Sequence, residues 1–244
     1  MFFFCKPSKI AVDCFTTHES SFHLAPIDLA VKYFPDWWKR LPKSIMAPNP
    51  VTLELGTLKK CYGLIELYKS SLILPLWSDI VIEPKPDNVY WWQCADGQTE
   101  IHSHPYQQIG DAFRNYHHGK INSPWFLKEK SGIKFMLSPC QWSLLPVSND
   151  LNLLSGISEF KYQHATNINF FLNLENKNRL LLEAGTPLYH IIPLSSKSIT
   201  VKQHLLTTQE FDKMFGLQKS RAKFLGNYNF RKKILQQKKC PFTG

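Results

Sequence analysis

The stretch from Gly156 to Ser195 constrains the fold of this chain more than any other part of the sequence. Its apolar residues come in short runs that are rich in Ile, Leu and Phe, and each run is bounded by turn-forming residues such as the Gly185-Thr186-Pro187 corner. This pattern predicts consecutive β-strands and not helices. The strands predicted here and just beyond are 167–174, 179–183, 187–194 and 198–204.

Further strands are predicted towards the N-terminus, where short apolar runs again alternate with turn signals. These strands are 9–16, 78–84, 88–94, 98–104, 124–128 and 133–137. The Asp96-Gly97 step predicts a tight hairpin, because Asp and Gly tolerate the positive φ that such turns require. Residues 105–120 are predicted as a long loop or a helical turn, and residues 139–155 as a loop.

Helices are predicted near both ends of the chain. Residues 25–43 indicate two short pieces, with Pro35 at the first position of the second. The spacing from Leu64 to Leu72 favours another helix. Thr207 and Glu210 form a capping-box pattern that opens a helix with interruptions expected at Gly216 and Gly226.

These elements predict a mainly β protein of the α+β type, an antiparallel β-sandwich or jelly-roll-like barrel. Short helices lie near its N-terminus and a helical segment at its C-terminus. We expect residues 1–77 to pack on a core formed by residues 78–206, with residues 207–244 as a C-terminal helix and basic extension.

Composition limits the class of protein. The chain has 244 residues, of which 43% are hydrophobic, enough for a packed core. No apolar run approaches the roughly 18–20 residues that span a bilayer, and no secretory signal is evident, so we expect no membrane partner. The predicted location is the cytoplasm of a host cell, or a virion.

Charge is distributed very unevenly. The net charge is +10, yet residues 213–244 contain nine Lys or Arg and no Asp or Glu, which leaves +1 for the first 212 residues. Such a segment attracts nucleic acid or an acidic protein surface. The residues predicted to bind are Lys219, Arg221, Lys223, Arg231, Lys232, Lys233, Lys238 and Lys239. The alternative is a solubilising surface segment with no partner.

Three histidines form the candidate metal site. His102 and His104 alternate along a predicted strand, so both could face one side, with Glu100 on the same face. The arrangement resembles cupin barrels, in which a later histidine, here His190, completes the site. That resemblance implies a 2-oxoglutarate-type oxygenase that uses Fe(II). The chain departs from the cupin pattern by carrying Gln107 or Gln108 where cupins carry Glu. The alternative is that these histidines lie at the surface and bind no metal.

Residues 120–194 also resemble the strand pattern of dUTPases and dCTP deaminases, in the segments 156–162 and 185–192. The resemblance implies a nucleotide-binding protein in which Glu159 positions water and sugar and Tyr162 stacks near the base. His190 replaces the Gln of that pattern, and no Ser-Gly phosphate-binding motif precedes it.

Across most of its length the chain resembles an uncharacterised family found in tailed phages. The resembling segments are 33–42, 74–79, 123–125 and 185–194. Together with the absence of a complete set of catalytic residues, this predicts a virus-type, non-enzymatic binding or assembly protein without a cofactor. Homo-oligomers are compatible with the sequence.

Overall fold

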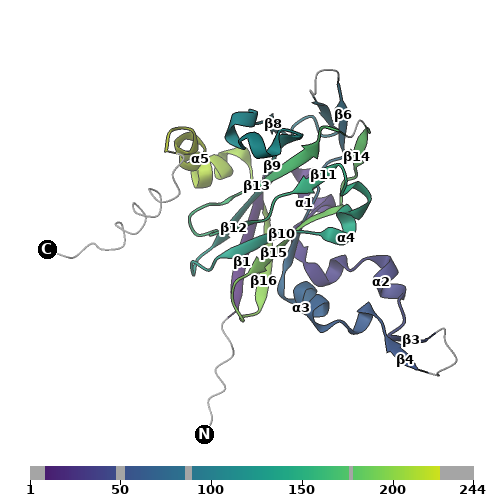
Figure 1. Cartoon of the computed structure of the whole chain (residues 1–244). Coiled ribbons are helices and arrows are strands. Elements are labelled where there is room, and N and C mark those ends of the chain that lie inside the picture. The colour runs from purple at the N-terminus through teal and green to yellow at the C-terminus, as the bar shows by residue number, and fades with distance from the viewer. Residues whose placement is uncertain (1–8, 48–52, 86–89, 176–177, 226–244) are drawn as a thin grey trace, which may run out of the picture.

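The computed structural model of the chain describes residues 9–47, 53–85, 90–175 and 178–225 (Figure 1). Its strands form two large sheets that share one hydrophobic core, with two smaller sheets beside them. Most paired strands are antiparallel, and short helices flank the sheets. The prediction of a mainly β, sandwich-like fold of the α+β class is confirmed. No helix among the described residues is long and apolar enough to cross a bilayer.

The first large sheet joins the two ends of the described chain. Its strands, in spatial order, are β11 (Leu151–Leu153), β13 (Ala165–Asn173), β9 (Tyr116–Glu129), β1 (Ile10–Thr16) and β16 (Ile199–Leu205). A sixth strand, β8 (Ile101–Ser103), also pairs with β9. The pair β1–β16 is parallel, so the first described strand is locked against the last.

The second large sheet has the order β12 (Gly156–Ser158), β10 (Phe135–Pro139), β15 (Pro187–Pro193), β5 (Leu72–Pro75) and β2 (Asp28–Leu29). A three-stranded sheet contains β14 (Leu180–Leu182), β6 (Ile80–Pro84) and β7 (Tyr90–Cys94). A two-stranded sheet contains β3 (Ser44–Met46) and β4 (Glu54–Gly56). Because β1 and β5 lie inside the large sheets, the core includes strands that precede residue 78.

Strand β9 shows why the sequence forms a sandwich. Its burial alternates with a period of two, so that Ile121, Trp125 and Leu127 point into the core while the intervening residues face outward. Gly119 belongs to the inward set, opposite Phe170 of β13. A Cβ at Gly119 would lie 2.2 Å from Cζ of Phe170, so only glycine fits there. The predicted loop at 105–120 was therefore wrong in its last residues, which belong to β9.

The N-terminal helices are short. They are α1 (Glu19–Leu24), the 3-10 helix η1 (Ala30–Tyr33), α2 (Asp36–Arg40), the 3-10 helix η2 (Leu58–Lys60) and α3 (Tyr62–Ser70). Pro35 is the N-cap of α2 and not its first residue. The helix predicted to reach Leu72 ends at Ser70, because Leu72 begins the fully buried strand β5.

Four more short helical segments of the described chain lie in the two predicted loops. They are η4 (Tyr106–Gln108), η5 (Asp111–Phe113), α4 (Gln141–Leu144) and η6 (Leu145–Val147). The second loop also contains the short strand β11, which was not predicted.

The Asp96-Gly97 turn is present, but the hairpin predicted from it is not. Gly97 has a φ of 61°, and its N–H donates to the carbonyl of Cys94 at 3.1 Å. The strands on either side belong to different sheets, since β7 pairs with β6 and β8 pairs with β9. The turn therefore carries the chain from one sheet to another.

Helix α5 (Thr208–Leu225) is fixed to the outer face of the first sheet. The predicted capping box is confirmed, since Glu210 N–H donates to Thr207 Oγ1 at 3.3 Å and Thr207 N–H donates to Glu210 Oε2 at 2.9 Å. Phe211 and Phe215 pack against Phe126 with ring centroids 4.8 and 5.2 Å apart. The helix continues through Gly216, contrary to prediction, because one glycine costs a helix only about 1 kcal/mol.

Candidate functional site

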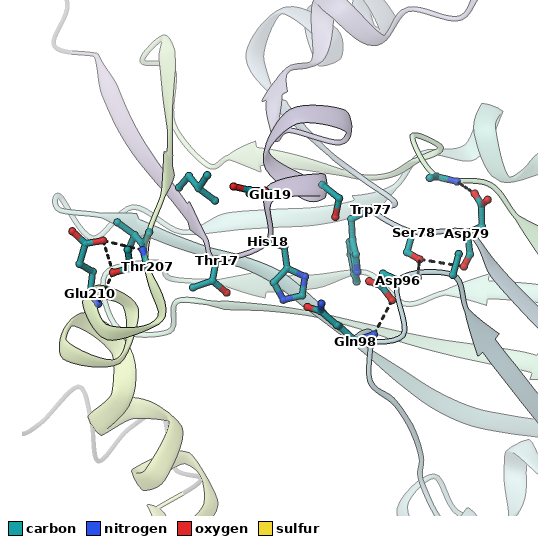
Figure 2. Close-up of a pocket in the computed structure, with 15 residues that line it drawn as sticks. Thr17, His18, Glu19, Trp77, Ser78, Asp79, Asp96, Gln98, Thr207 and Glu210 are labelled. Carbon is teal, nitrogen blue, oxygen red and sulfur yellow. Dashed lines mark hydrogen bonds between the residues drawn. The ribbon is translucent and has the colours of Figure 1, made fainter.

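An open groove of about 890 Å³ lies where five segments from distant parts of the sequence meet (Figure 2). They are the start of α1, the connection from β5 to β6, the turn after β7, the connection from β14 to β15, and the start of α5. The lining residues are Thr17, His18, Glu19, Ser20, Trp77, Ser78, Asp79, Ala95, Asp96, Gln98, Ala184, Leu205, Leu206, Thr207 and Glu210.

The groove is acidic in a chain that is basic overall. Four carboxylates line it, those of Glu19, Asp79, Asp96 and Glu210, and no Lys or Arg is among its lining residues. None of these four carboxylates forms an ion pair with a Lys or Arg of the described residues. Their negative potential is thus not neutralised locally and favours a cationic ligand.

Asp96 is the most firmly held of these carboxylates. The indole N–H of Trp77 donates to Thr99 Oγ1 at 2.8 Å, and the Thr99 hydroxyl donates to Asp96 Oδ2 at 2.6 Å. The backbone N–H groups of Gln98 and Thr99 donate to Asp96 Oδ1. Partial burial pushes the pKa of Asp96 upward, but these hydrogen bonds and nearby His18 outweigh it and hold the pKa below its ordinary value.

Two other carboxylates are positioned by the backbone. Asp79 Oδ1 accepts a hydrogen bond of 2.7 Å from the N–H of Ala184, and Glu210 belongs to the capping box with Thr207. Hydrogen bonds from Thr207 lower the pKa of Glu210. The groove therefore presents three carboxylates held by hydrogen bonds, and the pKa values of two of them, Asp96 and Glu210, are lowered. Such a surface can bind ammonium or guanidinium groups.

The predicted basic site lies mostly outside the described residues. Arg231, Lys232, Lys233, Lys238 and Lys239 are not described, and for Lys219, Arg221 and Lys223 the structure gives only their place in the second half of α5. Each ion pair of a Lys or Arg with a carboxylate in the described part of the chain joins residues that precede Lys213.

The three histidines of the candidate metal site are not brought together. His102 and His104 lie on and just after β8 in the first sheet, whereas His190 lies on β15 in the second. His102 Nε2 is 3.3 Å from Glu100 Oε2, as the predicted shared face requires, and both atoms contact the Asn122 amide. Within the described ranges, no group of three or more His, Cys, Asp or Glu side chains could hold a metal.

His190 is instead a buried structural residue. The Ser71 hydroxyl donates to the carbonyl of Leu67 at 2.6 Å, so its oxygen accepts from His190 Nδ1, 3.0 Å away. The Tyr68 and His190 rings are nearly perpendicular, with centroids 4.8 Å apart. Burial lowers the pKa of His190 to about 4, and the ring is neutral at pH 7.

His117 and His118 belong to β9, although the sequence placed them in a loop. Burial lowers the pKa of both, and the neighbouring histidines act in the same direction. His118 stacks on His104 with ring centroids 4.7 Å apart. The period-two alternation of Ile121, Ser123 and Trp125, extended backwards, is the sequence signal that could have placed these histidines in a strand.

The two residues singled out by the dUTPase-like pattern are buried in the turn after β12. Glu159 is 6% exposed and Tyr162 is 8% exposed. The Tyr162 N–H donates to the carbonyl of Glu159 at 2.9 Å. Neither residue lines the acidic groove.

The groove itself was missed by sequence reasoning, because its residues come from segments that share no local motif.

Comparisons with protein-family models, curated proteins and solved structures gave no match to this chain.

Proposed function

We propose that this chain is a non-enzymatic, virus-type binding or assembly protein whose basic C-terminal segment docks on nucleic acid. The observation that carries the proposal is the division of charge at Lys213: nine cations and no carboxylate follow it, and the rest of the chain is close to neutral. A phosphate backbone gains most from such a segment, because each neutralised phosphate releases counterions.

The anchoring of α5 supports this proposal. The capping box and the contacts of Phe211 and Phe215 fix the start of the helix on the sandwich. The chain therefore passes into its basic segment from a rigid base. Because no base-reading motif accompanies the charge, we expect binding that is independent of nucleic-acid sequence.

The test compares two full-length variants that lose equal charge. The tail-neutral variant carries Arg231→Gln, Lys232→Gln, Lys233→Gln, Lys238→Gln and Lys239→Gln. The body-neutral variant carries Lys69→Gln, Lys130→Gln, Lys134→Gln, Lys197→Gln and Lys202→Gln, five exposed lysines without an ion pair in the described chain. We expect the tail-neutral variant to bind DNA at least about tenfold more weakly than the body-neutral variant. Equal affinities of the two variants would refute the proposal.

A second candidate partner is an acidic protein surface, and the acidic groove of another copy of the chain offers one. Its four carboxylates face no Lys or Arg within the lining. In that case light scattering should show association at low salt that the tail-neutral variant loses. The substitutions Glu19→Gln and Asp79→Asn in the groove should also weaken this association.

The two enzymatic alternatives have less support. An iron-dependent oxygenase would need a metal bound by His102, His104 and His190, which lie in two different sheets. Elemental analysis after reconstitution with Fe(II) tests that alternative. A nucleotide-binding relative of dUTPase is tested by thermal shift with a panel of nucleotides.

A further inference from the structure

The hairpin formed by β3 and β4 has one apolar face. Ile45 lies directly opposite Leu55, and the Ala47 N–H donates to the carbonyl of Leu53 at 2.9 Å, which continues the same register. Since alternate residues of a strand share a face, Ile45, Ala47, Leu53 and Leu55 all lie on one side of the hairpin.

The opposite face is turned toward the chain that follows. The Ser44 hydroxyl donates to the carboxylate of Glu54, which also forms an ion pair with Lys60 of η2 at 4.0 Å. A Cβ added to Gly56 would lie 3.4 Å from Cδ of Lys60, so this side of the hairpin faces the Lys60 side chain. This face also carries Met46, which is 57% exposed, but its polar groups are the ones with partners inside the molecule.

The apolar face points outward. Ile45 is 48% exposed, Leu53 55% and Leu55 40%. Among the described strands β3 and β4 pair only with each other, and they lie at the periphery of the molecule beyond α2 and α3 (Figure 1). An isolated two-stranded sheet is only marginally stable in water, so an uncovered apolar face on one indicates that something else covers it.

Charge indicates what that partner is. Lys39 and Lys60 pair with Asp36 and Glu54, and the Lys59 ammonium donates to the carbonyl of Lys39 at 2.6 Å. Arg40 and Lys43 have no carboxylate partner in the described chain, so an anionic partner fits. A second copy of the hairpin would instead bring like charges together. Aliphatic side chains also offer no stacking surface for nucleic-acid bases.

The size and composition of the patch favour a lipid surface over a protein. A stable protein interface takes roughly 20–30 residues a side, far more than this hairpin exposes. Tyr62 at the start of α3, the helix that follows the hairpin, is also exposed, at 77%. Aliphatic side chains, an interfacial aromatic ring and cations without a carboxylate partner are the combination that binds the headgroup region of anionic membranes.

We propose that the β3–β4 hairpin docks on an anionic lipid surface. Ile45, Leu53 and Leu55 enter the boundary between headgroups and acyl chains, while Arg40 and Lys43 contact lipid phosphates. The contact lies on the membrane surface and needs no spanning helix, so it departs from the sequence-based expectation of no membrane partner without requiring a transmembrane segment. It uses a different part of the chain from the proposed nucleic-acid segment and does not depend on that function.

The test is co-sedimentation of the full-length chain with vesicles of phosphatidylcholine, with and without phosphatidylserine. The tail-neutral variant is the background for all measurements, because the basic segment would bind anionic vesicles by charge alone. On this background the hairpin variant carries Ile45→Ser, Leu53→Ser and Leu55→Ser. The matched control carries Ile157→Ser, Leu181→Ser and Leu194→Ser, which replace aliphatic residues that are 65%, 54% and 51% exposed.

We expect the background protein and the control to bind vesicles that contain phosphatidylserine, and the hairpin variant to bind at least about tenfold more weakly. Arg40→Glu with Lys43→Glu, which keeps the apolar face, should lower binding only to the anionic vesicles. Equal binding of hairpin variant and control, or no binding by the background protein, overturns the proposal. So does a dimer that forms without lipid and is lost in the hairpin variant, because the face would then be a protein interface.

Discussion

His190 makes the stability of this protein depend on pH in a way that can be calculated. The imidazole is 4% exposed, and burial lowers its pKa from 6.5 to about 4. Above pH 6.5 the ring is neutral in both the folded and the unfolded chain. Between pH 6.5 and about 4 the unfolded chain binds a proton that the folded chain does not, so stability falls as the pH falls.

The size of the effect follows from the two pKa values. Each pH unit between them corresponds to about 1.36 kcal/mol, so the full loss is about 3 kcal/mol, most of which is reached by pH 4.5. In His190→Asn the amide can still donate to Ser71 Oγ, but no group titrates. The variant is therefore less stable at pH 7, because packing on Tyr68 is reduced, yet its stability falls less on acidification.

The assay is urea unfolding followed by tryptophan fluorescence at several pH values from 7.5 to 4.5. The quantity of interest is the difference in unfolding free energy between wild type and His190→Asn. Contributions from His117, His118 and the carboxylates are common to both proteins and cancel. We expect this difference to shrink by about 2–3 kcal/mol over the range. A difference that stays constant with pH would refute the account of His190 as a buried neutral ring.

Two further predictions concern packing and the anchoring of α5. Gly119→Ala places a Cβ 2.2 Å from Phe170 Cζ and should destabilise the fold by about 1–3 kcal/mol in urea unfolding, with partial rescue by Phe170→Leu. A Gly119→Ala protein as stable as wild type would contradict the register of β9 and β13. Thr207→Ala removes the capping box of α5 and should cost about 1 kcal/mol by the same assay, whereas the exposed helical change Thr208→Ala should have little effect. Equal effects of the two Thr substitutions would argue against the cap.

The strands could be predicted from sequence where their local pattern is strong. Strands β1, β13, β15 and β16 begin and end within about two residues of the predicted positions, since alternation and turn residues act locally. Which strands pair depends on contacts far apart in the chain. The turn at Asp96-Gly97 looked like a hairpin, but its two strands have partners elsewhere, in β6 and β9.

The candidate site was less predictable than the fold. The charge of the C-terminal segment is visible in the sequence, because it needs only counting. The acidic groove is not, because Glu19, Asp79, Asp96 and Glu210 are brought together only by tertiary structure. The histidine spacing predicted only a local contact, since His102 does share a face with Glu100. It could not predict the position of His190, because nothing local indicates that this residue lies in the other large sheet.

The salt dependence of DNA binding tests the central proposal most directly. We expect the logarithm of the affinity of wild type to fall steeply and linearly with the logarithm of salt concentration. The slope of the tail-neutral variant should be less steep than that of wild type by about 0.7–0.9 for each substituted cation that contacts a phosphate. The slope of the body-neutral variant should match that of wild type. A slope that the tail substitutions leave unchanged would show that the basic segment does not bind nucleic acid.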